Sequence, residues 1–311
     1  MTVLLIGGGL IGAHIAKECT SSGEETVVIS YNPDHIYLKM IAGLKDEQIV
    51  DMAISNPSDL IKVLTTYNIR RIVIAAGSLH NSFMKHTGMA ILNESRLLLA
   101  IYAALFTYQI EKLIYVSSLA VYGPSNSRCE EEIPKPVSAY GITKFYNEQI
   151  INAIAKQFSI TALVIRPSGV IGPNPKRCGN WMSGEINRAL QEKMEPILIS
   201  SQLSTPNEYL DVRDLAQFIT GILLGRNGIP SFSEFDIVNI GTGKLVDGGE
   251  LILKMSQIVG REIVFTSNGV ETPKQRLSSA LPISKAIERY GYNPKTDISE
   301  SLAYIGGFYA K

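Results

Sequence analysis

Residues 2–12 of the chain are Thr-Val-Leu-Leu-Ile-Gly-Gly-Gly-Leu-Ile-Gly. The opening residues form a continuously apolar run, which is typical of a parallel strand that is buried on both faces. Gly7, Gly9 and Gly12 have the spacing Gly-x-Gly-x-x-Gly: the first glycine permits a tight turn, the second lets the backbone approach a pyrophosphate, and the third lets helix and strand pack closely. Because a helix is predicted from Leu10 to Ser21, its free N–H groups would face the phosphates. The sequence therefore predicts a dinucleotide-binding βαβ unit.

Strand and helix patterns continue to alternate beyond this unit. Further strands are predicted at Thr26–Ser30, Ile49–Met52, Arg71–Ala75, Lys112–Ser117, Thr161–Arg166, Asp236–Ile240 and Glu262–Thr266. Helices are predicted at Asn56–Tyr67, Met89–Tyr108, Ala139–Lys156, Gly249–Val259 and Ile283–Tyr290. Strands that alternate with helices imply right-handed crossovers. We therefore expect an α/β fold, a Rossmann doubly wound parallel sheet with a smaller, discontinuous C-terminal lobe.

The character of the sequence changes after the sixth predicted strand, where residues 167–175 are rich in Pro and Gly. We expect residues 1–166 to form an NAD(P)-binding Rossmann domain, to which residues 208–243 return. Residues 167–207 and 244–311 would form a lobe that binds the substrate.

The composition excludes several classes of protein. Lys+Arg and Asp+Glu both number 29, so the chain has no electrostatic footprint for nucleic acid or an anionic membrane. The 3 cysteines do not have metal-ligand spacing, so we expect reduced thiols and no metal site. The first strand begins too early to leave room for a signal segment. No apolar run approaches the ~20 residues that a bilayer requires, and we expect a cytoplasmic protein.

The predicted helices 89–108 and 139–156 are long, and the first is apolar on nearly every face. A helix that is apolar all round must be covered on both sides. One side can pack on the sheet, so we expect the other to form a subunit interface, and the protein to be a homodimer through these two helices. The alternative is a helix wholly buried within one chain.

The choice between the two nicotinamide dinucleotides depends on the end of the second predicted strand. An acidic residue there, ~20 residues after the glycines, would hold the ribose hydroxyls and repel a 2′-phosphate. The chain has Ser30-Tyr31-Asn32 at this place, without an acid or an arginine, and Asp34 follows in a loop. We expect NAD as the cofactor, without excluding NADP.

Tyr140 and Lys144 are four residues apart at the start of a predicted helix, a spacing that sets both on one face. A neighbouring ammonium and an oxidised nicotinamide would favour the phenolate, which could take a proton from a substrate hydroxyl while hydride leaves the same carbon. Ser118 follows the fifth predicted strand at the edge where ligands of open α/β sheets bind, and its hydroxyl could orient the substrate oxygen. The alternative is an exposed pair of helix side chains and an ordinary turn.

Together, the glycine turn, residues 117–123 (Ser-Ser-Leu-Ala-Val-Tyr-Gly) and the Tyr-x-x-x-Lys pair resemble the extended short-chain dehydrogenase/reductases, specifically their nucleotide-sugar epimerase/dehydratase family. Residues 166–173 (Arg-Pro-Ser-Gly-Val-Ile-Gly-Pro) resemble the family's Arg-Pro-x-Asn-Val-Tyr-Gly-Pro segment. The resemblance covers nearly the whole chain and implies catalytic roles for Ser118, Tyr140 and Lys144. It implies a cofactor site of Gly7, Gly9, Leu10, Ile11, Gly12, Ser30, Asp51, Met52, Ala75, Ala76, Gly77, Asn93, Tyr140, Lys144 and Pro167. It implies substrate contacts by Ser118, Ser168, Gly169 and Arg276.

The family's sugar-nucleotide 4-epimerases imply a definite reaction cycle. Tyr140 would remove the C4 hydroxyl proton while hydride passes to the nicotinamide, and after the 4-keto sugar rotates, hydride would return to its other face. An alternative is an NAD(P)H-dependent reductase of a 4-keto nucleotide sugar or a related carbonyl. A dinucleotide sensor without activity is a further alternative, against which the intact Ser118, Tyr140 and Lys144 argue.

The chain departs from the family's pattern where substrate is recognised. Gly169 replaces an asparagine, and Asn207-Glu208 replaces an Arg-Asp pair whose arginine holds a diphosphate. Arg276 is a candidate replacement, the alternative being a solvated surface arginine. Leu119-Ala120 replaces the Asp-Glu pair of the dehydratases, and Leu119 also excludes the cysteine of the epimerase/reductase that makes a fucose nucleotide.

Overall fold

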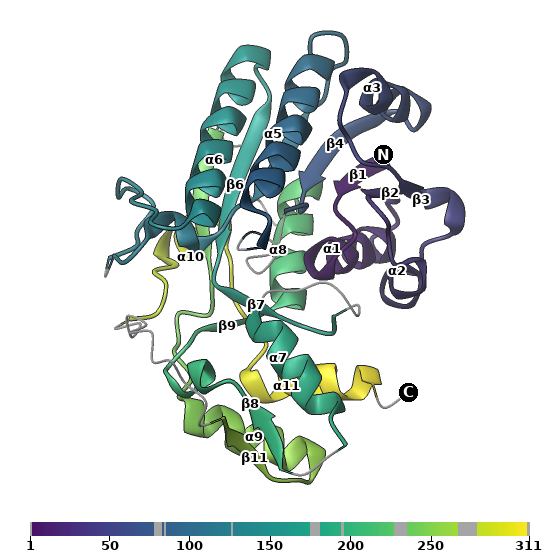
Figure 1. Ribbon diagram of the computed structural model, residues 1–311. Helices are drawn as coiled ribbons and strands as arrows, with labels where there is room; N and C mark the ends of the chain where they lie inside the picture. The colour runs from purple at the N-terminus through teal and green to yellow at the C-terminus, as the bar shows by residue number, and fades with distance from the viewer. Residues whose placement is uncertain are drawn as a thin grey trace.

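The structure is a computed structural model that describes residues 2–77, 83, 85–125, 127–174, 181–193, 196–226, 235–266 and 279–309. Figure 1 shows a larger lobe built on a sheet and a smaller lobe below it, where the chain ends. This architecture confirms the predicted α/β fold, a doubly wound parallel sheet with a smaller C-terminal lobe.

The main sheet has seven strands, paired in parallel in the order β10-β6-β5-β4-β1-β2-β3. Its strands are β1 (Thr2–Ile6), β2 (Glu25–Ser30), β3 (Ile49–Asp51), β4 (Ile69–Ile74), β5 (Lys112–Val116), β6 (Thr161–Pro167) and β10 (Phe235–Ile240). The strand order reverses between β1 and β4, and such a switch point opens a ligand crevice at the carboxyl ends of the strands. The glycine turn that follows β1 lies at this crevice.

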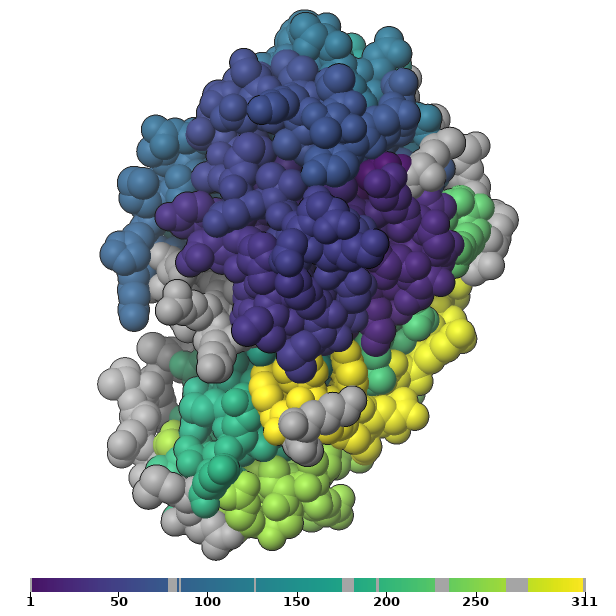
Figure 2. All heavy atoms as spheres, turned by 90° about the vertical axis from the view of Figure 1, so that its right-hand side faces the viewer, coloured from purple at the N-terminus to yellow at the C-terminus, as the bar shows by residue number. Residues whose placement is uncertain are grey.

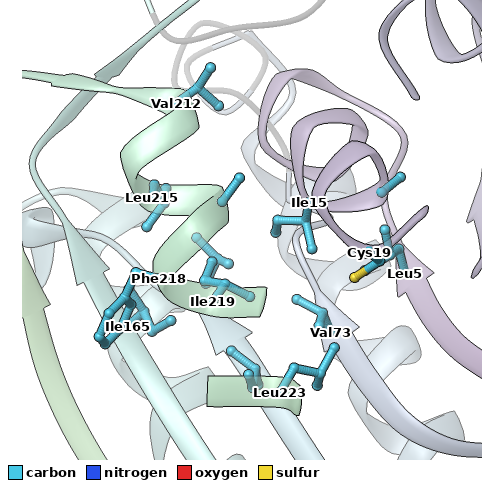
Figure 3. Packing of buried hydrophobic residues seen from close by; sticks show 14 of the residues in the cluster. Leu5, Ile15, Cys19, Val73, Ile165, Val212, Leu215, Phe218, Ile219 and Leu223 are labelled. Carbon is cyan, nitrogen blue, oxygen red and sulfur yellow. The ribbon is translucent and has the colours of Figure 1, made fainter. Parts of the chain in front are cut away.

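Helices cover both faces of the main sheet because residues along each strand alternate between the faces. Val3 and Leu5 of β1 belong to one buried cluster, and Leu4 and Ile6 belong to another. The first cluster includes α1 (Leu10–Ser21), α2 (His35–Ala42), α8 (Val212–Leu224) and α10 (Ser284–Tyr290). The second includes α3 (Pro57–Thr66), α5 (Thr87–Ala104) and α6 (Ala139–Phe158). Figure 3 shows side chains of the first cluster from α1, α8 and the sheet, among them Ile15, Leu215, Ile219, Val73 and Ile165.

The smaller lobe has a hydrophobic core of its own. Two short parallel pairs form in it, β7 (Gly169–Ile171) with β9 (Tyr209–Asp211) and β8 (Ile197–Ile199) with β11 (Ile263–Phe265). The helices α7 (Trp181–Gln191), α9 (Gly248–Val259) and α11 (Ile298–Tyr309) contribute to its core, whose buried residues include Ile186, Leu203, Leu251, Met255 and Leu302. Figure 2 shows the C-terminal residues, in yellow, between the purple N-terminal residues and the green surface of this lobe.

The short 3₁₀ helices are η1 (Asp46–Gln48), η2 (Leu119–Tyr122) and η3 (Ser201–Ser204).

Some helices differ from the sequence prediction. The helices α2, α7, α8 and α11 were not predicted, and the helix expected over residues 89–108 runs from Thr87 to Ala104. The start of α8 carries no separating turn, because Asp211 ends β9 and also caps the helix by accepting a hydrogen bond from Arg213 N at 2.7 Å. Because β9 passes directly into α8, the sequence has no turn residues between them that would indicate where the helix begins.

Three general features of the described residues bear on the function. Their helices include none with the length and apolar character that crossing a bilayer requires. Cys19 and Cys129 are free thiols, and Cys178 lies outside the described ranges. Within those ranges, no three His, Cys, Asp or Glu side chains gather in a way that could hold a metal ion.

A buried ion pair joins α6 to the sheet near its carboxyl edge. Arg166 donates from Nε to Glu148 Oε1 at 3.0 Å and from Nη2 to Glu148 Oε2 at 2.6 Å. Glu148 Oε1 also accepts from Ser117 Oγ at 2.5 Å. The Tyr122 hydroxyl accepts from Arg166 Nη1 at 2.9 Å and donates to Asn239 Oδ1 at 2.8 Å. The network therefore ties β6, β10, η2, α6 and the residue that follows β5 together at the carboxyl edge of the sheet.

We expect Arg166→Leu to lower the free energy of unfolding by about 3–5 kcal/mol, because it leaves the Glu148 carboxylate buried without its counter-charge. The double variant Arg166→Leu/Glu148→Leu should recover most of this loss, since both buried charges are then removed. Urea denaturation of the two variants and the wild type measures the difference. Equal stability of the single variant and the wild type would contradict the role of the pair.

Candidate active site

The glycine turn after β1 presses against the end of β4. Gly7 has φ of +109°, a conformation that favours glycine, and its N–H donates to Ile29 O at 2.7 Å. A Cβ at Gly7 would lie 2.5 Å from Ala76 N, and a Cβ at Gly12 would lie 1.8 Å from Gly7 O. No side chain fits at either position, as expected where the first glycine forms a tight turn and the third lets helix and strand pack closely.

The first turn of α1 is available to an anion. Gly9 precedes the helix and provides no side-chain cap, and the first turn carries no acidic residue. The N–H groups at a helix start without such a cap, together with the helix dipole, favour a phosphate. Leu10 is buried and Ile11 half-buried beside them, so these residues and the glycine turn fit a dinucleotide.

The Asp51 carboxylate lies at the end of β2, although it belongs to the neighbouring strand β3. Ser30 pairs with Asp51 of β3, and Met52 N donates to Ser30 O at 3.0 Å. The Asp51 carboxylate accepts a hydrogen bond from Asn32 N at 2.8 Å. The register of two strands thus brings a negative charge to the place where the sequence of β2 lacks an acid.

Residues Ala75, Ala76 and Gly77 link the glycine turn to Lys144. Ala75 N donates to Ile6 O at 2.9 Å, which extends the pairing of β4 with β1 beyond its last strand residue. A Cβ at Gly77 would lie 2.7 Å from Lys144 Nζ. The backbone that follows β4 therefore runs between the cofactor crevice and the lysine.

Tyr140 and Lys144 lie in the first turns of α6. The helix begins at Ser138, whose Oγ accepts a hydrogen bond from Gly141 N at 3.0 Å. The Lys144 ammonium is buried at 5.7 Å from the centroid of the Tyr140 ring and 5.2 Å from that of Tyr115. The two proposed catalytic groups of α6 are therefore neighbours in space as well as in the sequence.

Ser118 lies immediately beyond β5 at the same edge. Its Oγ accepts a hydrogen bond from Ala120 N at 3.2 Å, which caps η2. The start of α6 packs closely on this turn, since a Cβ at Gly141 would lie 2.5 Å from Ala120 O. This contact brings the turn that carries Ser118 against the turn that carries Tyr140.

The residue of α5 that faces Lys144 is Glu94 and not Asn93. Asn93 is exposed, whereas Glu94 is buried and its Oε2 lies 3.6 Å from Lys144 Nζ. Burial alone would lower the pKa of Lys144, but the Glu94 carboxylate and the two facing tyrosines outweigh it and raise that pKa. Sequence reasoning missed Glu94, although an acidic residue inside a mainly apolar helix is a signal that it has a partner.

Pro167, Ser168 and Gly169 lie where the chain passes into the smaller lobe. Ser168 N donates to Ile240 O at 2.9 Å, and Ser168 Oγ is buried without a hydrogen-bond partner. A Cβ at Gly169 would lie 2.4 Å from Met182 Cε and 2.7 Å from Glu208 O. An asparagine does not fit at position 169, so this position has only its backbone to offer a ligand.

Glu208 braces the loops around this region. Its Oε1 accepts from Thr242 N at 2.6 Å and Gly243 N at 3.1 Å, and its Oε2 accepts from Leu281 N at 2.7 Å. The carboxylate is therefore occupied by three backbone donors from two segments, residues 242–243 and Leu281. Arg276, the candidate phosphate ligand, lies outside the described residues.

The fold and the site together define a class of proteins: doubly wound enzymes that bind a dinucleotide and place a tyrosine–lysine pair beside it. Residues 3–241 match the model of the NAD dependent epimerase/dehydratase family, and the chain belongs to this family. Among curated relatives, an uncharacterized UDP-glucose epimerase of Bacillus subtilis, YtcB, is 24% identical over 99% of both chains.

Solved structures of the same fold include UDP-glucose 4-epimerase from Bifidobacterium longum in complex with NAD+ and UDP. That structure is 18% identical, covers 100% of this chain and 98% of its own, and gives a TM-score of 0.83. UDP-glucuronic acid 4-epimerase from Bacillus cereus, in complex with UDP-glucuronic acid and NAD, is 22% identical, covers 100% and 99%, and gives a TM-score of 0.79. At these identities the likeness establishes the fold.

We expect Gly12→Ala to weaken NAD binding by at least about tenfold, or about 1.4 kcal/mol, because its Cβ would displace the glycine turn from the pyrophosphate position. Isothermal titration of NAD into protein freed of bound nucleotide measures the change. Gly307→Ala is a matched control, since a Cβ there meets no atom within 4 Å. Equal affinities of Gly12→Ala and the wild type would contradict the assignment of the turn.

Proposed function

We propose that the protein is an NAD-dependent nucleotide-sugar epimerase that inverts C4 of its substrate through a transient 4-keto sugar. The observation that carries this proposal is the buried Lys144 ammonium, 5.7 Å from the Tyr140 ring, beside a glycine turn that fits a dinucleotide. Membership of the NAD dependent epimerase/dehydratase family supports it. The names of the relatives, which include UDP-glucose and UDP-glucuronic acid epimerases, favour a UDP-sugar as the substrate.

The chain's own residues have distinct roles in this reaction. Tyr140, as the phenolate, takes the proton of the C4 hydroxyl. Lys144 stabilises the phenolate through its positive charge, and Ser118 donates a hydrogen bond to the reacting oxygen. NAD, held by the glycine turn and α1, supplies the hydride acceptor and donor when it is bound. The same three side chains serve both the oxidation and the reduction at C4, because the proton returns from Tyr140 to the oxygen after the 4-keto sugar has rotated.

The surroundings of β2 and β3 favour NAD over NADP. The Asp51 carboxylate, held by Asn32 N at the end of β2, would repel a 2′-phosphate. The exposed side chains that follow β2 include Tyr31 and Asn32, neither of which is a cation. Tyr31 and Asn32 therefore offer no positive charge that would offset the repulsion between the Asp51 carboxylate and a 2′-phosphate.

The same geometry predicts the effect of removing the phenol. Tyr140→Phe should lower the rate of epimerisation by about 10²–10⁴-fold, because the general base is lost. Proton NMR of UDP-glucose, UDP-galactose or UDP-glucuronic acid incubated with the protein measures C4 inversion directly. Tyr67→Phe is a matched control, because its hydroxyl bonds to Glu47 O far from the crevice. Undiminished inversion by Tyr140→Phe would contradict the proposed mechanism, and net consumption of added NADH with a 4-keto sugar would indicate a reductase instead.

We also propose that the protein is a homodimer through α5 and α6. The two helices lie side by side in Figure 1, and their outward apolar side chains are exposed. Leu92 and Leu99 are seven residues apart and therefore lie along one side of α5, Phe106 follows the end of that helix, and Ile142 and Tyr146 are one turn apart on α6. A second copy of the same surface would cover this apolar stripe by an isologous contact.

Leu99→Lys should weaken this dimer by at least about tenfold, because a lysine ammonium would be buried at the interface. Light scattering coupled to gel filtration over a dilution series measures the dissociation constant. Leu253→Lys, at a residue of similar exposure on α9, should leave the oligomeric state unchanged. A monomeric wild-type protein at micromolar concentration would contradict the proposal.

A further inference from the structure

Glu94 is a carboxylate within a helix that is otherwise mainly apolar. It is 6% exposed, while Asn93 next to it points to solvent. A buried ionised group is costly unless a partner of opposite charge or hydrogen-bond donors compensate it. The contacts of Glu94 therefore show which groups compensate the burial of its carboxylate.

Two residues of α6 provide this compensation. Lys144 Nζ lies 3.6 Å from Glu94 Oε2, and both side chains are almost completely buried. Asn147 Nδ2 donates to the same oxygen at 2.8 Å and also approaches the Tyr115 hydroxyl at 3.0 Å. The carboxylate thus faces the catalytic lysine and is held in place by a second residue of the same helix.

The groups around Lys144 come from three elements. Glu94 reaches it from α5, the Tyr115 ring from β5, and the Tyr140 ring from α6 itself. The backbone of Gly77 also lies against the ammonium, since a Cβ at this residue would be 2.7 Å from Lys144 Nζ. Of these three neighbours, Glu94 is the one with a carboxyl group. Its field therefore decides whether the buried amine stays protonated.

We propose that Glu94 is a positioning residue of the active site, which holds the Lys144 side chain as an ammonium between the rings of Tyr115 and Tyr140. The proposal depends on the proposed function only for the use that is made of Lys144. Without the carboxylate, desolvation would favour the neutral amine, and a neutral amine can neither stabilise the Tyr140 phenolate nor remain centred beside the two rings.

The sign of the pH dependence follows from this environment. Burial alone lowers the pKa of Lys144, and the Glu94 carboxylate, with smaller contributions from Tyr115 and Tyr140, reverses the shift so that the pKa is raised. The wild-type ammonium therefore persists at alkaline pH. In Glu94→Gln only the smaller contributions of Tyr115 and Tyr140 oppose the lowering of the Lys144 pKa by burial, so Lys144 loses its proton at a lower pH than in the wild type, and activity falls on the alkaline side.

The direct test is a pH titration of the protein labelled with ¹³C at lysine Cε, with the Lys144 signal assigned by its loss in Lys144→Arg. We expect the wild-type signal to titrate after those of the surface lysines, and the Glu94→Gln signal to titrate at least about one pH unit earlier than in the wild type. Glutamine retains an oxygen that can accept from Asn147, so the substitution removes the charge with little change in shape. Glu111→Gln, an exposed acid at the opposite edge of the sheet, is the matched control and should shift nothing.

A Lys144 signal that titrates at the same pH in Glu94→Gln and the wild type would overturn the proposal. If Glu94→Gln fails to fold, Glu94→Asp, which retains the charge on a shorter stem, should give a smaller shift in the same direction, and no shift would again overturn it. Where activity is measurable, the ratio of the rates at pH 9 and pH 7 should fall about tenfold in Glu94→Gln, while a purely structural role would lower both rates equally. The titration needs no substrate, so a protein with the predicted shift but without epimerase activity would refute the proposed function alone.

Discussion

The need to neutralise charges that are buried on α6 organises the catalytic end of the molecule. Tyr140, Lys144 and Glu148 follow one another at four-residue intervals and so lie on the face of the helix that is turned inward. Lys144 meets a carboxylate from α5, and Glu148 meets a guanidinium from β6. Since breaking either pair leaves an uncompensated charge in the interior, the two pairs fix the rotation and the register of α6. The position of the Tyr140 ring beside Lys144 is a consequence of these constraints.

How far the sequence predicts the site depends on the range of the interactions involved. The glycine turn and the Tyr140–Lys144 pair are local patterns, and their spacing alone sets the backbone conformation and the shared helix face. Glu94 was not predicted as a site residue, because a shift of one residue on a helix, from Asn93 to Glu94, rotates the side chain by about 100°, from the exposed side to the interior. The resemblance implies Asp51 as a cofactor residue, but the sequence of β2 could not show that pairing with β3 brings this carboxylate to the end of β2. Likewise, the reason for Gly169 lies in Met182 and Glu208, which are distant in the sequence.

The recognition side of the crevice is built differently from the catalytic side. Glu208 is occupied by the backbone donors of Thr242, Gly243 and Leu281, and therefore serves to hold loops together. Ser168 Oγ, in contrast, is buried and has no hydrogen-bond partner among the described residues. The proposed catalytic edge is thus fixed by buried ion pairs, whereas the residues of the proposed substrate region depart from the family's pattern.

The most direct test of the central claim is to identify what the purified protein carries. Denaturing the protein and analysing the released small molecules by mass spectrometry should detect NAD, in an amount close to that of the chain, because the proposed cycle regenerates the cofactor and does not require its release. Release of NADP in its place would contradict the role given to Asp51. A folded protein that releases no dinucleotide and takes up none when NAD is added would contradict the account as a whole.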